Sequence, residues 1–411
     1  MSTPSPLPAT DVTVVGTGAA ALAAAVTAHD GGARVTVVER TSSVGGTTAV
    51  SGGGVWMPQN HLMAERGVGD SREEALAYMT RLTAGRTPVD LLERYVDDGP
   101  GIVADLEKRA GLQLSPMSWP DYHPEMDGAK PAGRMLEPEL FGADALGSWG
   151  ERIRKAPVLG LPITLQEATA DWRPAYSPER FDAAEIGRRV AARQLACGQA
   201  LVAALLLACL QRGIEPVLET RAAELTLDGE AVSGIVVESE GRRSRVDAGA
   251  VVLASGGYEW NTDLRSRFLP GPLTHPHSPP TNEGDGLLMA MEVGADVANM
   301  NEAWWYPAAS LPGERYEGRP LARFVGVERT APHTVIVNRF GQRFVNEAAN
   351  YNDMQKAFFS FDANEYAPRN LPCWVVFDRQ YRSRYPVVGV RPGDPDRRNE
   401  VATFTRAVRA T

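Results

Sequence analysis

One short segment near the start of the chain constrains its fold more than any other feature. An apolar run, Val12-Thr-Val-Val15, leads directly into Gly16-Thr-Gly18-Ala-Ala-Ala21, and an alanine-rich stretch continues to about Asp30. The first run predicts a β-strand and the second a helix. A further strand, predicted over Arg34–Glu39, ends on an acid 23 positions after Gly16. This spacing predicts a strand–turn–helix–strand unit that binds a dinucleotide.

Each residue of this unit has a physical role in such a site. Gly16 permits the tight turn, and Gly18 lets the backbone approach a pyrophosphate at the helix N-terminus. Glu39 can accept hydrogen bonds from the adenosine ribose. Ala21 occupies the position of the third glycine of the fingerprint. A small residue is needed there only so that the helix can pack closely against the strand. The alternative is an ordinary βαβ turn in which the glycine pair has no ligand.

Length, charge and cysteine content narrow the class of protein. The 411 residues suffice for two domains, and the net charge of −9 argues against nucleic acid and anionic membrane surfaces as partners. Three scattered cysteines predict neither a disulfide framework nor a thiolate metal site, and they favour the reducing cytoplasm. The most apolar stretch, Gln194–Leu210, contains polar residues and ends at Gly213, so we expect a helix buried against a sheet and no transmembrane segment.

Two further segments are rich in small residues. Nearly every residue of Ser42–Gly54 is small, which suits a backbone packed against a large flat ligand, although a flexible glycine loop is the alternative. The run Ala250–Gly257 predicts an apolar strand that returns to the parallel sheet and approaches the same ligand. The turn Gly284-Asp-Gly286 opens an amphipathic helix, with Asp285 near its positive end.

The remaining chain predicts three regions: a loose tail over 1–10, a first domain over 11–303 and a second domain over 304–411. Helices are expected over 70–112, begun by Ser71 and by Thr87-Pro88, and an irregular lid over 113–180. Short strands are predicted over Glu215–Glu219, Ala223–Leu227, Ala231–Glu238 and Arg245–Val246, and in the second domain over Thr334–Asn338, Gln342–Val345 and Cys373–Phe377.

These pieces resemble flavoproteins of the fumarate reductase / 3-ketosteroid dehydrogenase superfamily. Four blocks carry the resemblance: Val14–Ala21, Glu39–Gly53, Val251–Gly257 and Gly284–Gly286. The resemblance implies an α/β fold, with a Rossmann-like FAD-binding domain of the glutathione-reductase type and an inserted α+β substrate domain. It also implies FAD as cofactor, with the isoalloxazine ring against Thr47–Gly54. The implied cofactor-binding residues are Gly16, Gly18, Ala19, Ala20, Glu39, Arg40, Gly45, Gly46, Thr47, Thr48, Ser51, Gly52, Gly53, Ala254, Gly256, Gly257, Gly284 and Asp285.

Within the superfamily, three motifs look most like the 3-ketosteroid Δ1-dehydrogenase branch: Gly45–Asn60, Pro120–Glu125 and Arg343–Tyr351. The implied reaction is 1,2-dehydrogenation of a ring ketone, in which a base removes a proton next to the carbonyl and a hydride passes to flavin N5. By motif position Tyr351 is the candidate base and Tyr122 the assisting hydroxyl. Either tyrosine could instead be a packing residue. The substrate is expected to be a small apolar, steroid-like ketone, and the electron acceptor is unknown.

The chain departs from the family pattern after Cys373–Tyr381. The expected return to the flavin domain, which carries ketone-polarising donors, is absent before Thr411, so we interpret the chain as C-terminally truncated. Two alternatives therefore stay open. One is a fumarate or other enoate reductase, which needs an Arg and His set to hold a dicarboxylate; Arg323, Arg329 and His333 lie in the right domain but form no recognisable motif. The other is an inactive FAD-binding fragment or pseudoenzyme.

Other conspicuous side chains carry less weight. His275-Pro-His277 has no further ligands nearby in the sequence, so no metal site is expected. The aromatic triplet Trp304-Trp-Tyr306 could line a steroid pocket, although an interdomain packing cluster is the more usual role of such a group.

Overall fold

The computed structural model describes residues 7–311, 313–388, 390 and 392. These residues form two compact units. Of the described residues, the first unit contains 7–171, Asp182–Tyr258 and Thr281–Val297, and the second contains Trp172–Phe181, Glu259–Pro280 and those from Ala298 onward. The sequence prediction drew one boundary after residue 303, whereas two earlier segments belong to the second unit. Residues 1–6 of the predicted tail, and nearly all of the chain after 390, lie outside the described residues.

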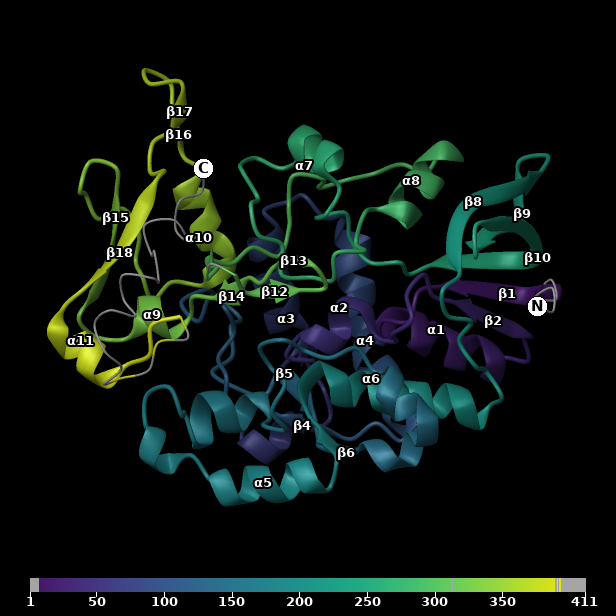
Figure 1. The fold of residues 1–411 in the computed structure, drawn as a ribbon, viewed down its shortest axis with the longest axis horizontal. Coiled ribbons are helices and arrows are strands. Elements are labelled where there is room, and N and C mark those ends of the chain that lie inside the picture. The colour runs from purple at the N-terminus through teal and green to yellow at the C-terminus, as the bar shows by residue number, and fades with distance from the viewer. Residues whose placement is uncertain (1–6, 312, 389, 391, 393–411) are drawn as a thin grey trace. The chain divides into compact units, whose positions relative to one another are not determined.

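A five-stranded sheet forms the centre of the first unit, in the order β2-β1-β10-β9-β8. Strands β1 (Thr10–Val15), β2 (Val35–Val38) and β10 (Arg242–Leu253) supply its parallel part, in which Val14 lies opposite both Val37 and Val252. Strands β8 (Arg221–Asp228) and β9 (Ala231–Ser239) extend it in the antiparallel sense (Figure 1). The predicted strand–turn–helix–strand unit is therefore present, with helix α1 (Ala19–Asp30) between β1 and β2.

Strand β10 differs from the sequence prediction. Arg245–Val246 and the run from Ala250 were expected to be separate strands, yet a single strand of 12 residues contains both. Its first half pairs with β9 and its second half with β1, so one strand joins the meander to the parallel sheet. The predicted strand over Glu215–Glu219 is wrong, because only Val217 forms an isolated parallel bridge, to Val38.

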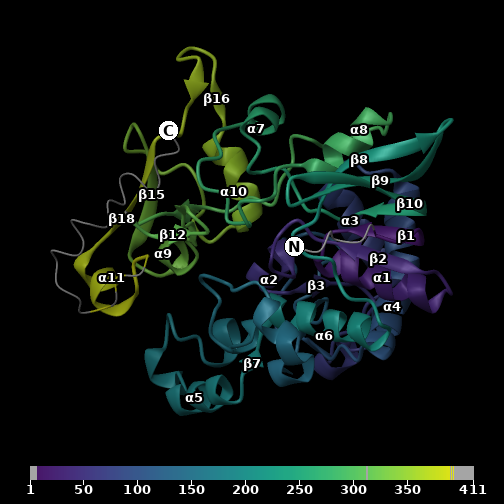
Figure 2. The same cartoon turned by 45° about the vertical axis from the view of Figure 1, so that its right-hand side comes forward.

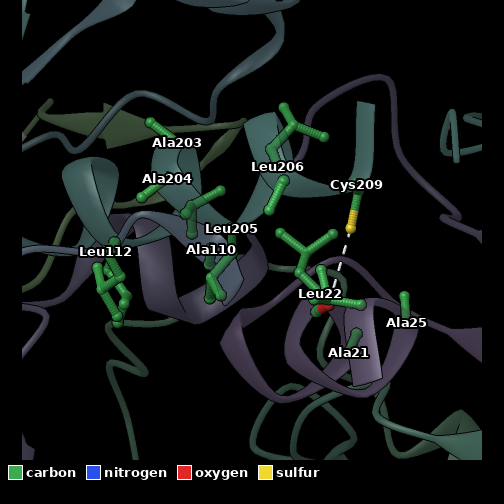
Figure 3. Packing of buried hydrophobic residues seen from close by; sticks show 14 of the residues in the cluster. Ala21, Leu22, Ala25, Ala110, Leu112, Ala203, Ala204, Leu205, Leu206 and Cys209 are labelled. Atoms are coloured by element: carbon green, nitrogen blue, oxygen red, sulfur yellow. Dashed lines mark hydrogen bonds between the residues drawn. The ribbon is translucent and has the colours of Figure 1, made fainter. Parts of the chain in front are cut away.

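The apolar helix α6 (Cys197–Gln211) is buried along almost its whole length. Its burial is therefore confirmed. Its main partners are the helices α1 and α2 (Gly46–Val50), while its contacts with strands are smaller and involve the short strands β5, β6 and β7. Figure 3 shows Leu206 and Cys209 of α6 next to Leu22 of α1, whose backbone carbonyl accepts a contact of 3.7 Å from the Cys209 thiol, and Leu205 beside Ala110. Within the described residues, no helix is long and apolar enough to cross a membrane.

Two helices in the first unit begin where the sequence predicts, and the second also ends at the expected glycine. The Ser71 side chain accepts a hydrogen bond from the Glu74 amide and caps α3 (Arg72–Thr83). Helix α4 (Val89–Ala110) follows Pro88 and ends at Gly111, whose φ is +59°. The other elements of this unit are β3 (Val55–Trp56), η1 (Met63–Arg66), β4 (Leu114–Pro116), β5 (Met135–Pro138), β6 (Phe141–Gly142), η2 (Ala143–Arg152), η3 (Glu167–Asp171), α5 (Ala183–Ala191), β7 (Gln194–Leu195) and α8 (Asp285–Glu292).

The second unit is built around an antiparallel pair, β15 (Thr334–Asn338) and β18 (Cys373–Phe377), with α10 (Tyr351–Phe358) beside it (Figure 2). Both strands were predicted. The strand expected over Gln342–Val345 is wrong, since Arg343 makes only an isolated bridge to Val337. The other elements are η4 (Pro178–Arg180), α7 (Thr262–Phe268), β11 (Ala308–Ala309), β12 (Arg315–Tyr316), β13 (Arg319–Pro320), β14 (Arg323–Phe324), α9 (Val327–Thr330), β16 (Phe361–Asp362), β17 (Ala367–Pro368) and α11 (Arg379–Arg384).

Candidate functional site

The first unit contains a cavity of about 530 Å³ at the carboxyl ends of the parallel strands. Its wall combines the turn after β1, the start of α2, the end of β10 and the start of α8, which are up to 270 residues apart in the chain. Ligands of open α/β sheets bind at this end of the strands, and a volume of this size suits a cofactor. The cavity is therefore the candidate ligand site of the first unit.

Glycine is required at the first position of the turn. Gly16 has a φ of +108°, and a Cβ atom built on it would lie 2.4 Å from the Ala254 carbonyl oxygen. Gly18 is the N-cap of α1, which has no acidic residue in its first turn. Its neighbour Ala19 donates its amide to Thr48 Oγ1 at 3.1 Å, which joins this turn to the small-residue segment. The helix end thus faces the cavity with its positive dipole uncompensated.

Glu39 lines the cavity but already has protein partners. One carboxylate oxygen accepts the Thr17 hydroxyl at 2.6 Å, and the other accepts the amide and hydroxyl of Thr41, both at 3.0 Å. Thr17 in turn accepts the Gly45 amide at 3.0 Å. A carboxylate has about four acceptor positions, so Glu39 can hold these donors and still accept from a ribose hydroxyl.

Charged side chains line another part of the cavity wall. Arg40 donates to the Thr281 carbonyl at 2.8 Å and to Asp285 at 3.1 Å, while Arg221 forms a bidentate pair with Asp285 at 2.8 and 2.9 Å. The buried Arg154 also lines this cavity. Arg40 also donates to Glu283 at 3.0 Å, so Asp285 and Glu283 together balance the charges of Arg40 and Arg221. The N-terminus of α1 and the buried Arg154 are then the features of the wall that suit a phosphate-bearing ligand.

The structure divides the predicted cofactor residues into two groups. The cavity wall includes Gly16, Gly18, Ala19, Ala20, Glu39, Arg40, Gly46, Thr47, Thr48, Ala254, Gly256 and Asp285. The wall does not include Gly45, Ser51, Gly52, Gly53, Gly257 and Gly284.

The glycines of the second group lack a side chain because other parts of the protein pack against them. A Cβ atom on Gly53 would lie 2.7 Å from the Cys197 carbonyl carbon, and one on Gly45 would lie 2.7 Å from Ala49 Cβ. Gly284 caps α8 with a φ of +84°, and its amide donates to the Gly257 carbonyl at 3.0 Å. These glycines therefore allow close contact between chain segments. This role does not depend on whether a given glycine also contacts a ligand.

Sequence reasoning missed several residues of the cavity wall. They include Thr17, Arg154, Thr220, Arg221, Ala222 and Asn282. Thr17 lies inside the Val14–Ala21 block and could have been found there, whereas Asn282 lies two residues before the Gly284–Gly286 block. Arg154 and Arg221 follow no local motif, and only the tertiary fold brings them to the cavity.

Tyr122 belongs to the first unit and follows β4 in the chain. Its neighbour Asp121 is buried and accepts hydrogen bonds from Trp56 Nε1 at 2.7 Å, the Lys130 amide at 2.8 Å and Arg134 at 2.8 Å. Arg134 is 1 % exposed and also forms a bidentate pair with Asp70. The loop that carries Tyr122 is thus anchored by a buried ionic network.

Tyr351 belongs to the second unit and is the first residue of α10. Its hydroxyl oxygen accepts a hydrogen bond from Trp304 Nε1 at 3.3 Å, and its ring lies edge-on to Phe324, with centroids 5.2 Å apart. Phe324 makes a similar contact with Tyr306 at 5.4 Å, and burial raises the pKa of Tyr306 above its ordinary value. Tyr351 therefore lies in an aromatic cluster, together with the exposed Trp304.

The three candidate residues for a dicarboxylate clamp are each engaged elsewhere. Arg323 forms a bidentate pair with Glu314, at 2.7 and 3.0 Å. Arg329 is buried and donates to the carbonyls of Glu347 and Ala349, and His333 lies 3.1 Å from Asp378. This arrangement does not resemble a substrate clamp.

Other potential chemistry is limited in the described part of the chain. No group of three or more His, Cys, Asp or Glu side chains there could hold a metal ion. Cys197, Cys209 and Cys373 are buried free thiols, and burial raises the pKa of each to about 12. They are therefore poor nucleophiles in the folded protein.

A glycine turn over a parallel sheet, with a phosphate-compatible cavity, defines a dinucleotide-binding protein of the flavoprotein type. The chain belongs to the FAD binding domain family, whose model matches residues 11–391. The cavity fits FAD, because Gly16 leaves the turn free of a Cβ atom, α1 directs its N-terminus to the cavity, and arginines line the wall.

Several proteins of known activity are similar to this chain over most of its length. It is 40 % identical to 4-oxocyclohexanecarboxylate 2-dehydrogenase of Sinomonas cyclohexanicum, over 94 % of this chain and 67 % of that protein. It is 32 % identical to 3-oxosteroid 1-dehydrogenase of Mycolicibacterium smegmatis, over 93 % and 70 %. The crystal structure of 3-ketosteroid Δ1-dehydrogenase from Sterolibacterium denitrificans superposes with a TM-score of 0.84 at 35 % identity, over 96 % of this chain and 73 % of that chain. These matches confirm the α/β flavoprotein fold.

Proposed function

We propose that this protein is an FAD-dependent dehydrogenase that introduces a carbon–carbon double bond next to the carbonyl of a ring ketone. The observation that carries the proposal is Tyr351 at the start of α10, with its hydroxyl held by Trp304 and its ring in an aromatic cluster. The family and the FAD-compatible cavity supply the other half of the argument. When bound, FAD would supply the hydride acceptor that such a reaction needs.

The protein's own contribution is proton removal and orientation. Tyr351, as a phenolate, takes the proton from the carbon next to the carbonyl, and the electron pair left behind becomes the new double bond as the neighbouring carbon loses its hydride. The indole of Trp304 fixes the hydroxyl of Tyr351 in one direction. We assign Tyr122 as the assisting hydroxyl, on a loop whose neighbouring Asp121 is anchored by Arg134.

A 3-ketosteroid ring is our first candidate substrate. Two of the side chains in contact with Tyr351 are Trp304 and Phe324, which offer a flat apolar surface to a fused ring system. Among the described residues of the second unit, Arg323 and Arg329 are committed to Glu314 and to backbone carbonyls. These contacts support an uncharged ring more than a carboxylate.

A monocyclic keto acid is the second candidate, and one observation favours it. The relative at 40 % identity is a 4-oxocyclohexanecarboxylate 2-dehydrogenase, whereas the 3-oxosteroid 1-dehydrogenases match at 28–32 % identity and the 3-ketosteroid Δ1-dehydrogenase structure at 35 %. Both substrates present a ring ketone to the same chemistry. They differ in whether a carboxylate or an extended apolar surface must be recognised.

Anaerobic bleaching of the bound flavin tests the proposal. We expect a 3-ketosteroid to bleach the flavin of the purified chain more than tenfold faster than 4-oxocyclohexanecarboxylate does. Faster bleaching by the keto acid would reverse the order of the two substrates. Reoxidation of the reduced protein by fumarate, without bleaching by either ketone, would support an enoate reductase. Bound flavin that reacts with none of them would identify an FAD-binding protein without this activity.

A matched pair of variants tests the assignment of the base. Tyr351→Phe should keep FAD bound and lower the bleaching rate by at least 10²-fold, as expected for loss of a general base. Tyr366→Phe is the control, because Tyr366 is in the same unit and is 85 % exposed. It should bleach at the wild-type rate. Wild-type bleaching by Tyr351→Phe would remove Tyr351 from the mechanism.

A further inference from the structure

Two consecutive residues of α10 bond to two consecutive residues of a neighbouring segment. Tyr351 Oη accepts the indole N–H of Trp304 at 3.3 Å, and Asn352 Oδ1 accepts the backbone amide of Trp305 at 2.8 Å. All four residues belong to the second unit. The start of α10 and the segment that contains the two tryptophans are therefore joined in one register by two hydrogen bonds.

The two hydrogen bonds are not equally able to hold this register. The Trp304–Tyr351 bond is long for an N–H···O contact, and Trp304 is 73 % exposed, so water competes for both partners. The Asn352–Trp305 bond has an ordinary length and is partly buried. The bond from Asn352 is therefore the one that can keep the two segments together.

Trp305 is held against α10 at both ends of the helix. Its amide bonds to Asn352 in the first turn. Its side chain is 6 % exposed, and its ring lies edge-on to Phe359 at the end of the helix, with centroids 5.5 Å apart. Because both its backbone and its ring are in contact with α10, Trp305 has little freedom to move relative to the helix.

Asn352 is itself held in one orientation. Asn350 caps α10 by accepting the Asn352 amide at 2.9 Å, and its side-chain amide donates to Asp353 at 2.9 Å. This cap fixes the first turn of the helix, and so the direction in which the Asn352 side chain leaves it. Only the oxygen of the Asn352 carboxamide can accept the Trp305 N–H, which defines how that group is turned.

The residues on both sides of Trp305 reach the side chain of Tyr351. Trp304 does so directly, through its indole N–H. Tyr306 does so through Phe324, whose ring makes edge-on contacts with Tyr306 and with Tyr351, at centroid distances of 5.4 and 5.2 Å. A bond that fixes Trp305 therefore also fixes the surroundings of the Tyr351 ring and hydroxyl.

We propose that Asn352 is a positioning residue for Tyr351: through the Trp305 amide it holds the segment whose side chains, Trp304 and Tyr306, set the direction of the Tyr351 hydroxyl. The inference rests on the proposed function, because it affects catalysis only if Tyr351 is the base. Asn352 itself neither accepts nor donates the transferred proton. A base removes a proton only when its oxygen points at that proton, so a small loss of register lowers the rate.

Fluorine NMR tests the structural part of the proposal. In the full chain, with fluorotryptophan in place of its eight tryptophans, the resonance of Trp304 is the one that disappears in Trp304→Phe. Tyr351→Phe and Asn352→Ala should both shift this resonance, because each removes a contact that orients the indole. Asn352→Asp keeps an oxygen acceptor for the Trp305 amide and should leave the resonance near its wild-type position. The control is Asn261→Ala, which removes the side-chain cap of α7 in the same unit and should not move it.

The rate of anaerobic flavin bleaching at saturating ketone, per bound flavin, tests the catalytic part. Trp304→Phe keeps an aromatic ring but loses the N–H donor. This variant and Asn352→Ala should each be about fivefold slower than the wild type, the effect of one ordinary hydrogen bond. Because both act through the same contact, the double variant should also be about fivefold slower, whereas independent effects would multiply to about 25-fold. Asn261→Ala should bleach at the wild-type rate.

Three results would overturn the inference. They are a Trp304 resonance that stays in place in Asn352→Ala, a resonance that moves as far in Asn352→Asp as in the alanine variant, and a double variant in which the two losses of rate multiply. If Asn352→Ala does not fold, Asn352→Leu, which has a similar volume, provides the same comparisons. Failure of the proposed function looks different: Tyr351→Phe would then bleach like the wild type, whereas the Trp304 resonance would still report whether Asn352 holds the segment.

Discussion

The two glycine-rich segments of the first unit look alike in sequence but are small for different reasons. In Gly16–Ala20 the described backbone faces the cavity, and Gly16 is confined by its φ of +108° and by the Ala254 carbonyl. In Ser42–Gly54 only Gly46–Thr48 reach the cavity wall. The glycines on either side, Gly45 and Gly53, meet Val202 and Cys197 of helix α6.

The difference shows what a run of small residues can and cannot indicate. It predicts that something approaches the backbone closely, but that neighbour can be a ligand or another part of the chain. Here α6 itself has a glycine at the contact: a Cβ atom on Gly198 would lie 1.7 Å from the Thr48 carbonyl oxygen. The second segment is therefore as much a helix-packing site as a ligand site.

The largest loss of stability is expected where helix α6 packs directly against the backbone of the second segment. Gly198→Ala should lower the free energy of unfolding by about 4 kcal/mol or more, because backbone atoms on both sides must move apart. Urea denaturation followed by circular dichroism measures this. Gly187→Ala, in α5 with open space around its Cα, is the control and should be neutral or stabilising. A stable Gly198→Ala protein would show that α6 does not pack on this segment.

Loss of the link between the segments should have an intermediate effect. The buried Thr17 hydroxyl donates to Glu39 Oε2 and accepts the Gly45 amide, so Thr17→Val removes the Thr17 partner of both groups, while Glu39 Oε1 keeps its bonds to Thr41. We expect destabilisation by about 2 kcal/mol. The control Thr83→Val, at a partly exposed position whose hydroxyl donates only to the Thr80 carbonyl of its own helix, should change stability by less than about 0.5 kcal/mol. If the two substitutions destabilised the protein equally, the Thr17 hydroxyl would not be an important link between the two glycine-rich segments.

A cavity-facing glycine should affect the ligand more than the fold. Gly46 has a φ of +48° and no atom within 4 Å of an added Cβ, so Gly46→Ala should cost only about 1 kcal/mol of stability. The methyl group would enter the cavity, and FAD affinity should fall about tenfold, measured by quenching of flavin fluorescence. Unchanged affinity would indicate that this part of the wall does not contact the cofactor.

The smallest expected effect concerns Cys197, which contacts Gly53. Burial, with the nearby carboxylates of Glu137 and Glu167, raises the pKa of this thiol to about 12. At pH 8 the group is therefore protonated in the folded state, and iodoacetamide should not label it until the protein unfolds. Labelling of the native protein, detected by mass spectrometry, would mean that the α6 contact opens readily.

Much of the first unit could be predicted from the sequence because local signals coincide there. The turn at Gly16, the acid at Glu39 and the cap at Ser71 each act within a few residues. The sequence did not show that β10 is one continuous strand, because its two halves pair with different strands. That pairing is decided by the arrangement of the sheet and not by the residues of β10 alone. The partners of α6 were missed for the same reason, since an all-apolar helix does not encode what it contacts.

The site was less predictable than the fold. Arg154 and Arg221 come to the cavity from segments with no motif of their own, and only tertiary structure places them there. The sequence singled out Arg329 as a candidate for binding a dicarboxylate, but could not show that its donors are taken by backbone carbonyls. The catalytic roles of Tyr122 and Tyr351, and the cytoplasmic location, stay predictions.

Titration of the flavin-free chain with FAD, with ADP as competitor, tests the central claim most directly. If the cavity beside Gly16 is the cofactor site, calorimetry should give one FAD per chain, and ADP should weaken FAD binding competitively because both place a pyrophosphate at the same turn. A chain that folds but binds no FAD, or binds it equally well in saturating ADP, would contradict the account.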